Sequence, residues 1–131
     1  MLDHVAVRVK NFAAARRFYE AALSPLGYAV VADYGSVIGM GQSKDKPTFW
    51  IGTPDAAGPG QPPSPLTSGA HLAFMSPDRR SVDAFHKAAL AAGGRDNGAP
   101  GLRPDYHANY YGAFAWDLDG NNIEAVCQKP A

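Results

Sequence analysis

The sequence predicts an α+β fold in which two tandem βαβββ modules form a curved mixed sheet around a shared cleft. Two observations support this prediction: strand-like and helix-like hydrophobic patterns alternate along the chain, and one stretch repeats at a fixed offset. A third comes from the closing stretch, residues 117–126. There Asp119-Gly120 is a strong two-residue turn signal between two apolar runs, which predicts a β-hairpin.

The first module is predicted to span about residues 1–53. Valines at every second position of residues 5–9 predict a half-buried strand. Asn11 can cap a helix that runs to about Leu23, because apolar side chains recur there three or four residues apart. Short apolar runs separated by turn residues then predict three strands, at residues 28–33, 36–41 and 47–52.

The repeat appears when residues 4–27 are laid over residues 71–94, an offset of 67 without a gap. Seven of these positions are identical, and they fall on the predicted strand and helix. They are His4/His71, Ala6/Ala73, Phe18/Phe85, Ala21/Ala88, Ala22/Ala89, Leu23/Leu90 and Gly27/Gly94. A duplicated module of this kind predicts an approximate twofold relation between the halves.

The second module is predicted to span about residues 70–128, after a Pro-, Gly- and Ser-rich linker or loop at residues 54–69. Ser76 is the predicted N-cap of its helix. Residues 93–104 are predicted to be irregular, so the first strand after this helix is poorly marked. His86 lies on the helix and is expected to be solvated.

Composition limits the possible partners. The chain has 131 residues, enough for one domain, and equal numbers of basic and acidic residues, 12 each, without a basic run that would bind nucleic acid. Its single cysteine, Cys127, suits a reducing compartment. The first residues enter a strand directly, and no apolar run has membrane length, so we expect a cytoplasmic protein without a membrane partner.

Strand alternation predicts where the polar side chains of the strands point. His4, His71 and Glu124 lie opposite the aliphatic faces that the helices would cover, so all three should face the cleft. Trp50 shares this orientation and corresponds to Glu124 when the last strands of the two modules are matched. Two imidazoles and one carboxylate form a facial triad that suits Fe(II), and also Mn(II), Ni(II) or Zn(II). Taken singly, each residue has an ordinary alternative, such as a packed histidine or a Glu124–Arg8 ion pair.

Several short motifs carry a resemblance that covers nearly the whole chain. They are Asp-His-Val-Ala-Val at residues 3–7, Arg-Arg-Phe-Tyr at 16–19, His-Leu-Ala-Phe at 71–74 and Asp-Leu-Asp-Gly-Asn-Asn-Ile-Glu at 117–124. With them the chain resembles the vicinal oxygen chelate superfamily, also called the glyoxalase, bleomycin-resistance and extradiol dioxygenase family. The resemblance implies paired βαβββ modules around a metal cleft, a small-molecule substrate whose adjacent oxygens the metal chelates, no organic cofactor, and a homodimer. It also implies that His4, His71 and Glu124 are the metal ligands.

Departures from the family's patterns bear on the reaction. Within the family that the chain resembles, glyoxalase-type lyases usually have a fourth, acidic metal ligand at the position of Trp50. An indole cannot act as the base that their proton-transfer chemistry needs. From His107 to Glu124 the spacing resembles the extradiol dioxygenase signature, but Phe114 replaces its tyrosine and Leu118 its proline.

The remaining candidate site residues surround the closing hairpin. His107, Tyr110 and Tyr111 are candidate proton carriers, although the histidine could equally be a solvated loop residue and the tyrosines packing residues. Trp50, Asn109 and Phe114 are candidates for substrate contact. Arg103 is a candidate for binding an anionic substrate group, although an arginine in a loop with proline and glycine is more often an ordinary surface residue.

Three functions stay open on the sequence. The first is a divalent-metal enzyme with dioxygenase, lyase, isomerase or transferase chemistry. The second is a metal-free binding protein of the antibiotic-sequestering type, which would hold an aromatic ligand by stacking. The third is a dimeric scaffold without a ligand.

Overall fold

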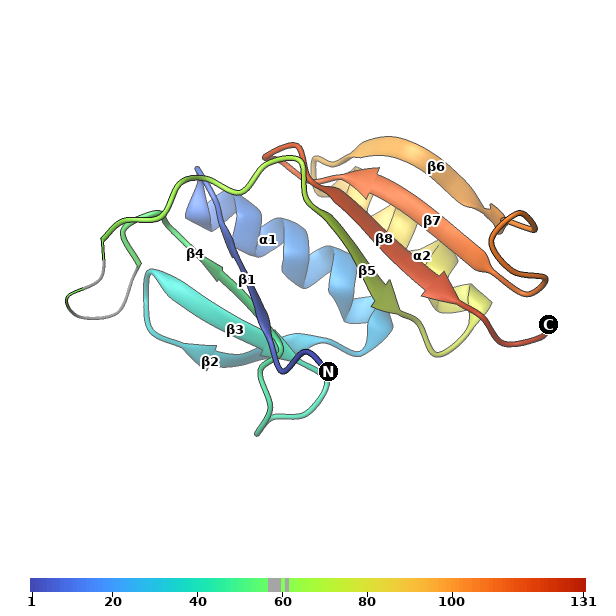
Figure 1. Cartoon of the computed structure of the whole chain (residues 1–131), viewed down its shortest axis with the longest axis horizontal. Coiled ribbons are helices and arrows are strands. Elements are labelled where there is room, and N and C mark those ends of the chain that lie inside the picture. The colour runs from blue at the N-terminus through green and yellow to red at the C-terminus, as the bar shows by residue number, and fades with distance from the viewer. Residues whose placement is uncertain (57–59, 61) are drawn as a thin grey trace.

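The structure is a computed structural model that describes residues 1–56, 60 and 62–131. Two four-stranded sheets lie next to each other, and both helices lie on the same side of them (Figure 1). The strand orders are β1-β4-β3-β2 and β5-β8-β7-β6, so each sheet belongs to one βαβββ module. The predicted α+β fold of two tandem modules is confirmed.

The elements follow the same order in both modules, apart from a short 3-10 turn, η1, after the first helix. Module one contains β1 (Val5–Arg8), α1 (Phe12–Leu23), η1 (Ser24–Leu26), β2 (Ala29–Asp33), β3 (Val37–Gly41) and β4 (Phe49–Gly52). Module two contains β5 (His71–Met75), α2 (Arg79–Ala91), β6 (Arg95–Leu102), β7 (Tyr111–Trp116) and β8 (Asn122–Cys127). Within residues 54–69, the described residues form neither helix nor strand, while 57–59 and 61 lie outside the described part.

The helix starts confirm one prediction and correct another. Asn11 caps α1, because its side-chain oxygen accepts a hydrogen bond of 3.1 Å from the amide of Ala14. Ser76 does not cap α2: the cap is Asp78, whose carboxylate accepts from the amide of Ser81 at 2.7 Å. The hydroxyl of Ser76 donates instead to the carbonyl of Asp78. Under the offset of the repeat, Asp78 is the residue that corresponds to Asn11.

Two further predictions about module two were wrong. Residues 95–102 form the strand β6 rather than an irregular stretch, and its pairing with β7 shifts register around Gly98. Glycine and proline hide the alternation of this strand, although its backbone still pairs. His86 is buried rather than solvated, and its Nε2 lies 2.9 Å from Oδ1 of Asp96 on β6.

The register of the two sheets follows the repeat. Ala6 on β1 pairs with Trp50 on β4, and the equivalent Ala73 on β5 pairs with Glu124 on β8. The predicted correspondence of Trp50 with Glu124 is therefore confirmed. On the other side of these residues the modules differ, since Gly39 pairs with Trp50 and Phe114 with Glu124.

The core continues from one module into the other. The ring of Phe49 lies 5.0 Å from that of Tyr19 and 5.2 Å from that of Phe74, both in edge-on arrangements. Helices α1 and α2 also pack against each other. This packing fixes the sheets next to each other and leaves the face opposite the helices uncovered in both (Figure 1).

A buried turn between β7 and β8 also joins the modules. Asp117 accepts hydrogen bonds from the hydroxyl of Tyr19 on α1 and from the amide and side chain of Asn121. Asn121, fully buried, accepts from the amide of Ala70 at 3.0 Å and donates to the carbonyl of Thr67 at 2.9 Å. The turn thereby holds the residues that lead into β5.

Neither helix in the described part of the chain is long and apolar enough to cross a membrane.

Candidate functional site

The first feature of the site is a contact between His71 and Glu124. Both side chains lie on the uncovered face of the second sheet, and Nε2 of His71 is 2.8 Å from Oε1 of Glu124. Glu124 is 1% exposed, whereas the His71 side chain is 54% exposed. A buried carboxylate needs partners, and here it has one that also faces solvent.

Tyr110 supplies the second partner of Glu124. Its hydroxyl donates to Oε2, the oxygen that His71 does not contact. Burial, followed by this hydrogen bond, raises the pKa of Tyr110 above its ordinary value, so the phenol stays protonated at neutral pH. The tyrosine is therefore a hydrogen-bond donor that fixes the orientation of the carboxylate.

Phe114 and Arg103 form the wall next to this pair. The centre of the Phe114 ring lies 6.2 Å from the centre of the His71 imidazole. The Arg103 guanidinium carbon lies 5.4 Å from the same Phe114 ring centre. The guanidinium and the imidazole therefore both lie near the Phe114 ring.

Two other candidates of module two, His107 and Tyr111, have hydrogen-bond partners other than Glu124. His107 is exposed in the turn between β6 and β7, where its Nδ1 accepts from the amide of Asn109 at 3.1 Å. Tyr111 is on the helix side of β7, and its hydroxyl donates to Asp83 on α2 at 2.7 Å. The structure therefore brings Tyr110 to Glu124, but not Tyr111.

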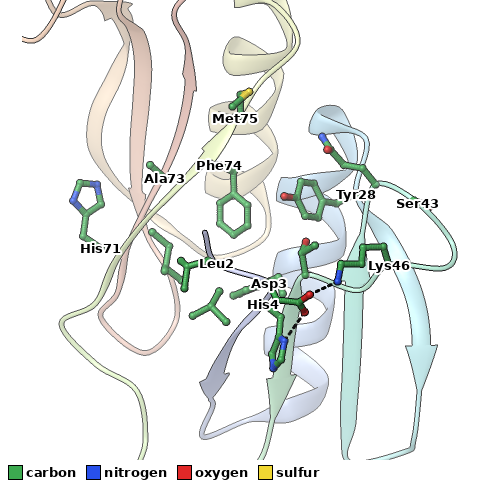
Figure 2. A pocket seen from close by; sticks show the side chains of 15 residues that line it. Leu2, Asp3, His4, Tyr28, Ser43, Lys46, His71, Ala73, Phe74 and Met75 are labelled. Atoms are coloured by element: carbon green, nitrogen blue, oxygen red, sulfur yellow. Dashed lines mark hydrogen bonds and ion pairs between the residues drawn. The ribbon is translucent and has the colours of Figure 1, made fainter.

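His4 lies on module one, away from the His71–Glu124 contact. Its side chain is 57% exposed, and its Nδ1 lies 2.8 Å from Oδ1 of Asp3. A cavity of about 550 Å³ between β1 and β5 is lined by both histidines, whose rings point in different directions (Figure 2). Among the described residues, no three His, Cys, Asp or Glu side chains lie close enough together to hold one metal ion.

Trp50 forms an aromatic surface on module one. Its ring stacks with that of Tyr34 at 6.3 Å and an interplanar angle of 10°. Gly39 leaves room for the indole, since a Cβ there would lie 3.0 Å from its ring carbons. Trp50 and Arg8 both line a cavity of about 250 Å³. The Arg8 guanidinium donates a hydrogen bond of 2.9 Å to the carbonyl of Ala56. The alternative ion pair between Arg8 and Glu124 is not formed.

Two residues that support the site were missed from the sequence. The sequence predicts only a hairpin turn at Asp117 and Asn121, yet both residues fix the start of β5, which carries His71. The signal available was a carboxylate and an amide spaced four residues apart in an otherwise apolar hairpin, because buried polar groups must hydrogen bond to each other or to the backbone.

The fold defines the class: a protein of two tandem βαβββ modules with a histidine–carboxylate pair on the uncovered face of one sheet. The chain belongs to the Glyoxalase/Bleomycin resistance protein/Dioxygenase superfamily, whose family model matches residues 1–125. A comparison with curated proteins found no match.

Solved structures agree with this assignment. A glyoxalase/bleomycin resistance protein from Albidiferax ferrireducens T118 is 34% identical, with a TM-score of 0.77 and 99% of each chain covered. A putative glyoxalase from Bacillus halodurans is 24% identical over 97% of this chain and 95% of its own, with a TM-score of 0.65. Lactoylglutathione lyase from Agrobacterium tumefaciens is 19% identical over 97% of this chain and 92% of its own, also with a TM-score of 0.65. The last two show similarity of fold.

Proposed function

We propose that this protein is a divalent-metal-dependent enzyme that acts on a small substrate with adjacent oxygens, by dioxygenase-like or glyoxalase-like lyase chemistry. The observation that carries the proposal is the 2.8 Å separation of His71 Nε2 and Glu124 Oε1. Two neighbouring ligands with metal bonds of about 2.0–2.2 Å place their donor atoms about 3 Å apart. The pair therefore fits two coordination positions of one Fe, Mn, Ni or Zn ion.

The surroundings of Glu124 support the same role. Metal-binding carboxylates are commonly oriented by a hydrogen bond from a neighbouring side chain. Tyr110 provides that bond to Oε2, which leaves Oε1 directed at His71. The exposed His71 imidazole gives the pair an open side, where a substrate can reach it.

We assign the third ligand to His4 of a second copy of the chain. His4 corresponds to His71 in the repeat, directly precedes β1, and lines the same cavity as His71. The helices hold the two sheets of one chain next to each other, so a second copy is needed to face them. Exposed apolar side chains beside the cavity, Leu2 and Met75, favour such contact. The proposed enzyme is thus a homodimer.

A bound divalent ion would polarise the substrate and hold its two adjacent oxygens. The chain's own groups have separate tasks. Tyr110 keeps Glu124 oriented and donates a hydrogen bond, while Phe114 packs against the substrate. His107 is the candidate proton carrier, because its Nδ1 is engaged by Asn109 and its Nε2 remains available.

Metal analysis tests this proposal. Protein purified without an affinity-tag metal or a chelator is expected to contain Fe, Mn, Ni or Zn, or to take one up, at about one ion per chain. Glu124→Ala should lose this ion, while Glu20→Ala, on the exposed side of α1, should keep it. Failure of the folded wild type to bind any of the four metals would overturn the proposal.

A metal-free binding protein of the antibiotic-sequestering type is the second candidate. The observation that favours it is the Tyr34–Trp50 stack beside the cavity of about 250 Å³. Stacking can hold a planar ligand without any metal. This candidate predicts that chelator-treated protein binds planar aromatic compounds with quenching of Trp50 fluorescence, and that Glu124→Ala binds them equally well.

A further inference from the structure

The Arg103 guanidinium is held in one position beside the candidate site. Its Nη2 donates to the carbonyl of Ala99 at 2.7 Å, and its planar group lies over the ring of Phe114. The main chain adds to this order, because the amide of Arg103 donates to the carbonyl of Tyr110 at 2.7 Å. The same loop base therefore fixes both Arg103 and the tyrosine that contacts Glu124.

Two glycines on β6 provide the space for this arginine. A Cβ at Gly98 would lie 2.9 Å from Cδ1 of Phe114 and 3.3 Å from Nη2 of Arg103. A Cβ at Gly101 would lie 3.2 Å from Nη1. Gly98 also has a φ of 151°, which side chains rarely adopt. A larger residue at either position would displace the guanidinium or the ring.

The charge of Arg103 is not neutralised locally. Within the part of the chain that the structure describes, no carboxylate forms an ion pair with it. Arg16 differs in this respect, because it pairs with Asp33 at 3.0 Å. The N–H groups of Arg103 that do not reach main-chain carbonyls therefore remain available to a ligand.

A pocket of about 310 Å³ opens next to this guanidinium. Its lining is otherwise neutral and consists of Asn97, Gly98, Tyr106, Phe114 and Asn122. The side chain of Asn97 donates to that of Asn122 at 3.1 Å, which holds two amides at the pocket. A single cation among neutral polar groups is suited to one carboxylate or a similar anion.

The pocket adjoins the His71–Glu124 contact through Phe114. The Arg103 guanidinium lies 5.4 Å and the His71 imidazole 6.2 Å from the centre of the Phe114 ring. Because both groups are close to one ring, the distance between them is limited. One small molecule can reach both if a few bonds separate its anionic group from its adjacent oxygens.

We infer that Arg103 is the specificity residue for an anionic substrate, a small acid whose carboxylate is a few bonds away from the two oxygens. The part of this inference that concerns the two adjacent oxygens rests on the proposed function. Binding of an anion in the pocket beside Arg103 does not depend on it. Arg103 binds the acid through charge-assisted hydrogen bonds, and Phe114 packs against the atoms in between.

Matched probes test the two parts separately. In chelator-treated protein, 3-phenylpropionate is compared with 3-phenylpropanamide by calorimetry or NMR titration. In metal-loaded protein, 3-(3,4-dihydroxyphenyl)propionate is compared with 4-ethylcatechol, which lacks the carboxylate. We expect the wild type to prefer each acid by roughly tenfold or more.

The variant Arg103→Met keeps the apolar stem and removes the charge, so it should lose this preference. Arg80→Met removes an exposed charge on α2 and should retain it. Circular dichroism and metal content establish that both variants fold and keep the rest of the site.

Each outcome has one meaning. No preference in the wild type, or an equal preference in Arg103→Met, overturns the anion site even when metal is bound. An Arg103-dependent preference in a protein that binds no metal supports the anion site and overturns the proposed metal function.

Discussion

Trp50 holds the register position in the first sheet that Glu124 holds in the second, each opposite an alanine of the neighbouring parallel strand. The two modules therefore share a backbone plan but differ in chemistry at the same point. One presents an indole stacked on Tyr34, and the other presents a buried carboxylate bonded to Tyr110 and His71. A metal site built on this plan has a carboxylate from one module only.

Changing Trp50 to glutamate should supply the missing carboxylate. In the proposed dimer, Trp50→Glu adds a negative ligand near the ion, so we expect metal affinity to rise by about tenfold or more. The measurement is competition with a chelating dye. Trp50→Gln is the control, since it removes the indole without adding charge; an equal rise in that variant would contradict the explanation.

Removing the hydroxyl of Tyr110 should loosen the carboxylate. Tyr110→Phe leaves Oε2 of Glu124 without its donor, and we expect metal affinity to fall by about 10- to 100-fold, as for other residues that orient ligands. Tyr106→Phe is the matched control, because Tyr106 packs edge-on against Tyr110 at 5.1 Å and is largely exposed. Unchanged affinity in Tyr110→Phe would remove the tyrosine from the site.

Asn121 should be important for stability. Asn121→Ala removes the hydrogen bonds to Ala70, Thr67 and Asp117 from a fully buried position. Each buried group left without a partner costs about 1–3 kcal/mol, so we expect at least about 2 kcal/mol less free energy of unfolding. Urea denaturation measures this loss. Asn97→Ala, at an exposed position, should change the free energy by less than about 0.5 kcal/mol.

Acid should weaken the start of α2. Hydrogen bonds from Ser81, chiefly its backbone amide, lower the pKa of Asp78 in the folded protein. A lowered pKa stabilises the fold above the unfolded value of about 3.9, and this contribution is lost as the pH falls through the folded value. Asp78→Asn accepts the same bond at any pH.

The wild type and Asp78→Asn should therefore differ by an amount that depends on pH. Their difference in melting temperature is expected to be constant from pH 7 to about pH 5 and to move against the wild type below about pH 4. The other carboxylates titrate in both proteins and cancel in this comparison. A difference that stays the same down to pH 3 would show that the Asp78 carboxylate does not couple to folding.

Local sequence patterns and the internal repeat predicted most of the fold. The valines of β1, the Asn11 cap and the Asp119-Gly120 turn are local signals, and each predicted its element. The offset of 67 also relates the Asp78 cap to Asn11, and the buried His86 to the buried Tyr19. β6 was missed because a strand rich in glycine and proline is held by pairing with β7 rather than by its own alternation.

The candidate site was harder to predict than the fold. Alternation correctly placed His71 and Glu124 on one face of their sheet, where they meet. It could not predict the location of His4 relative to them, because that depends on how α1 packs against α2. Side-by-side packing of the modules is a property of the folded core, and within one chain the His4 imidazole contacts Asp3 rather than Glu124.

Mixing two inactive variants tests the shared metal site most directly. His4→Ala and Glu124→Ala homodimers should each bind metal poorly. In a mixed dimer, His4 of the Glu124→Ala chain can combine with His71 and Glu124 of the His4→Ala chain to form one intact site. Co-expression with two different tags and isolation of the mixed dimer should therefore recover about one ion per dimer. A mixed dimer that binds no more metal than either parent would contradict a site assembled from two chains.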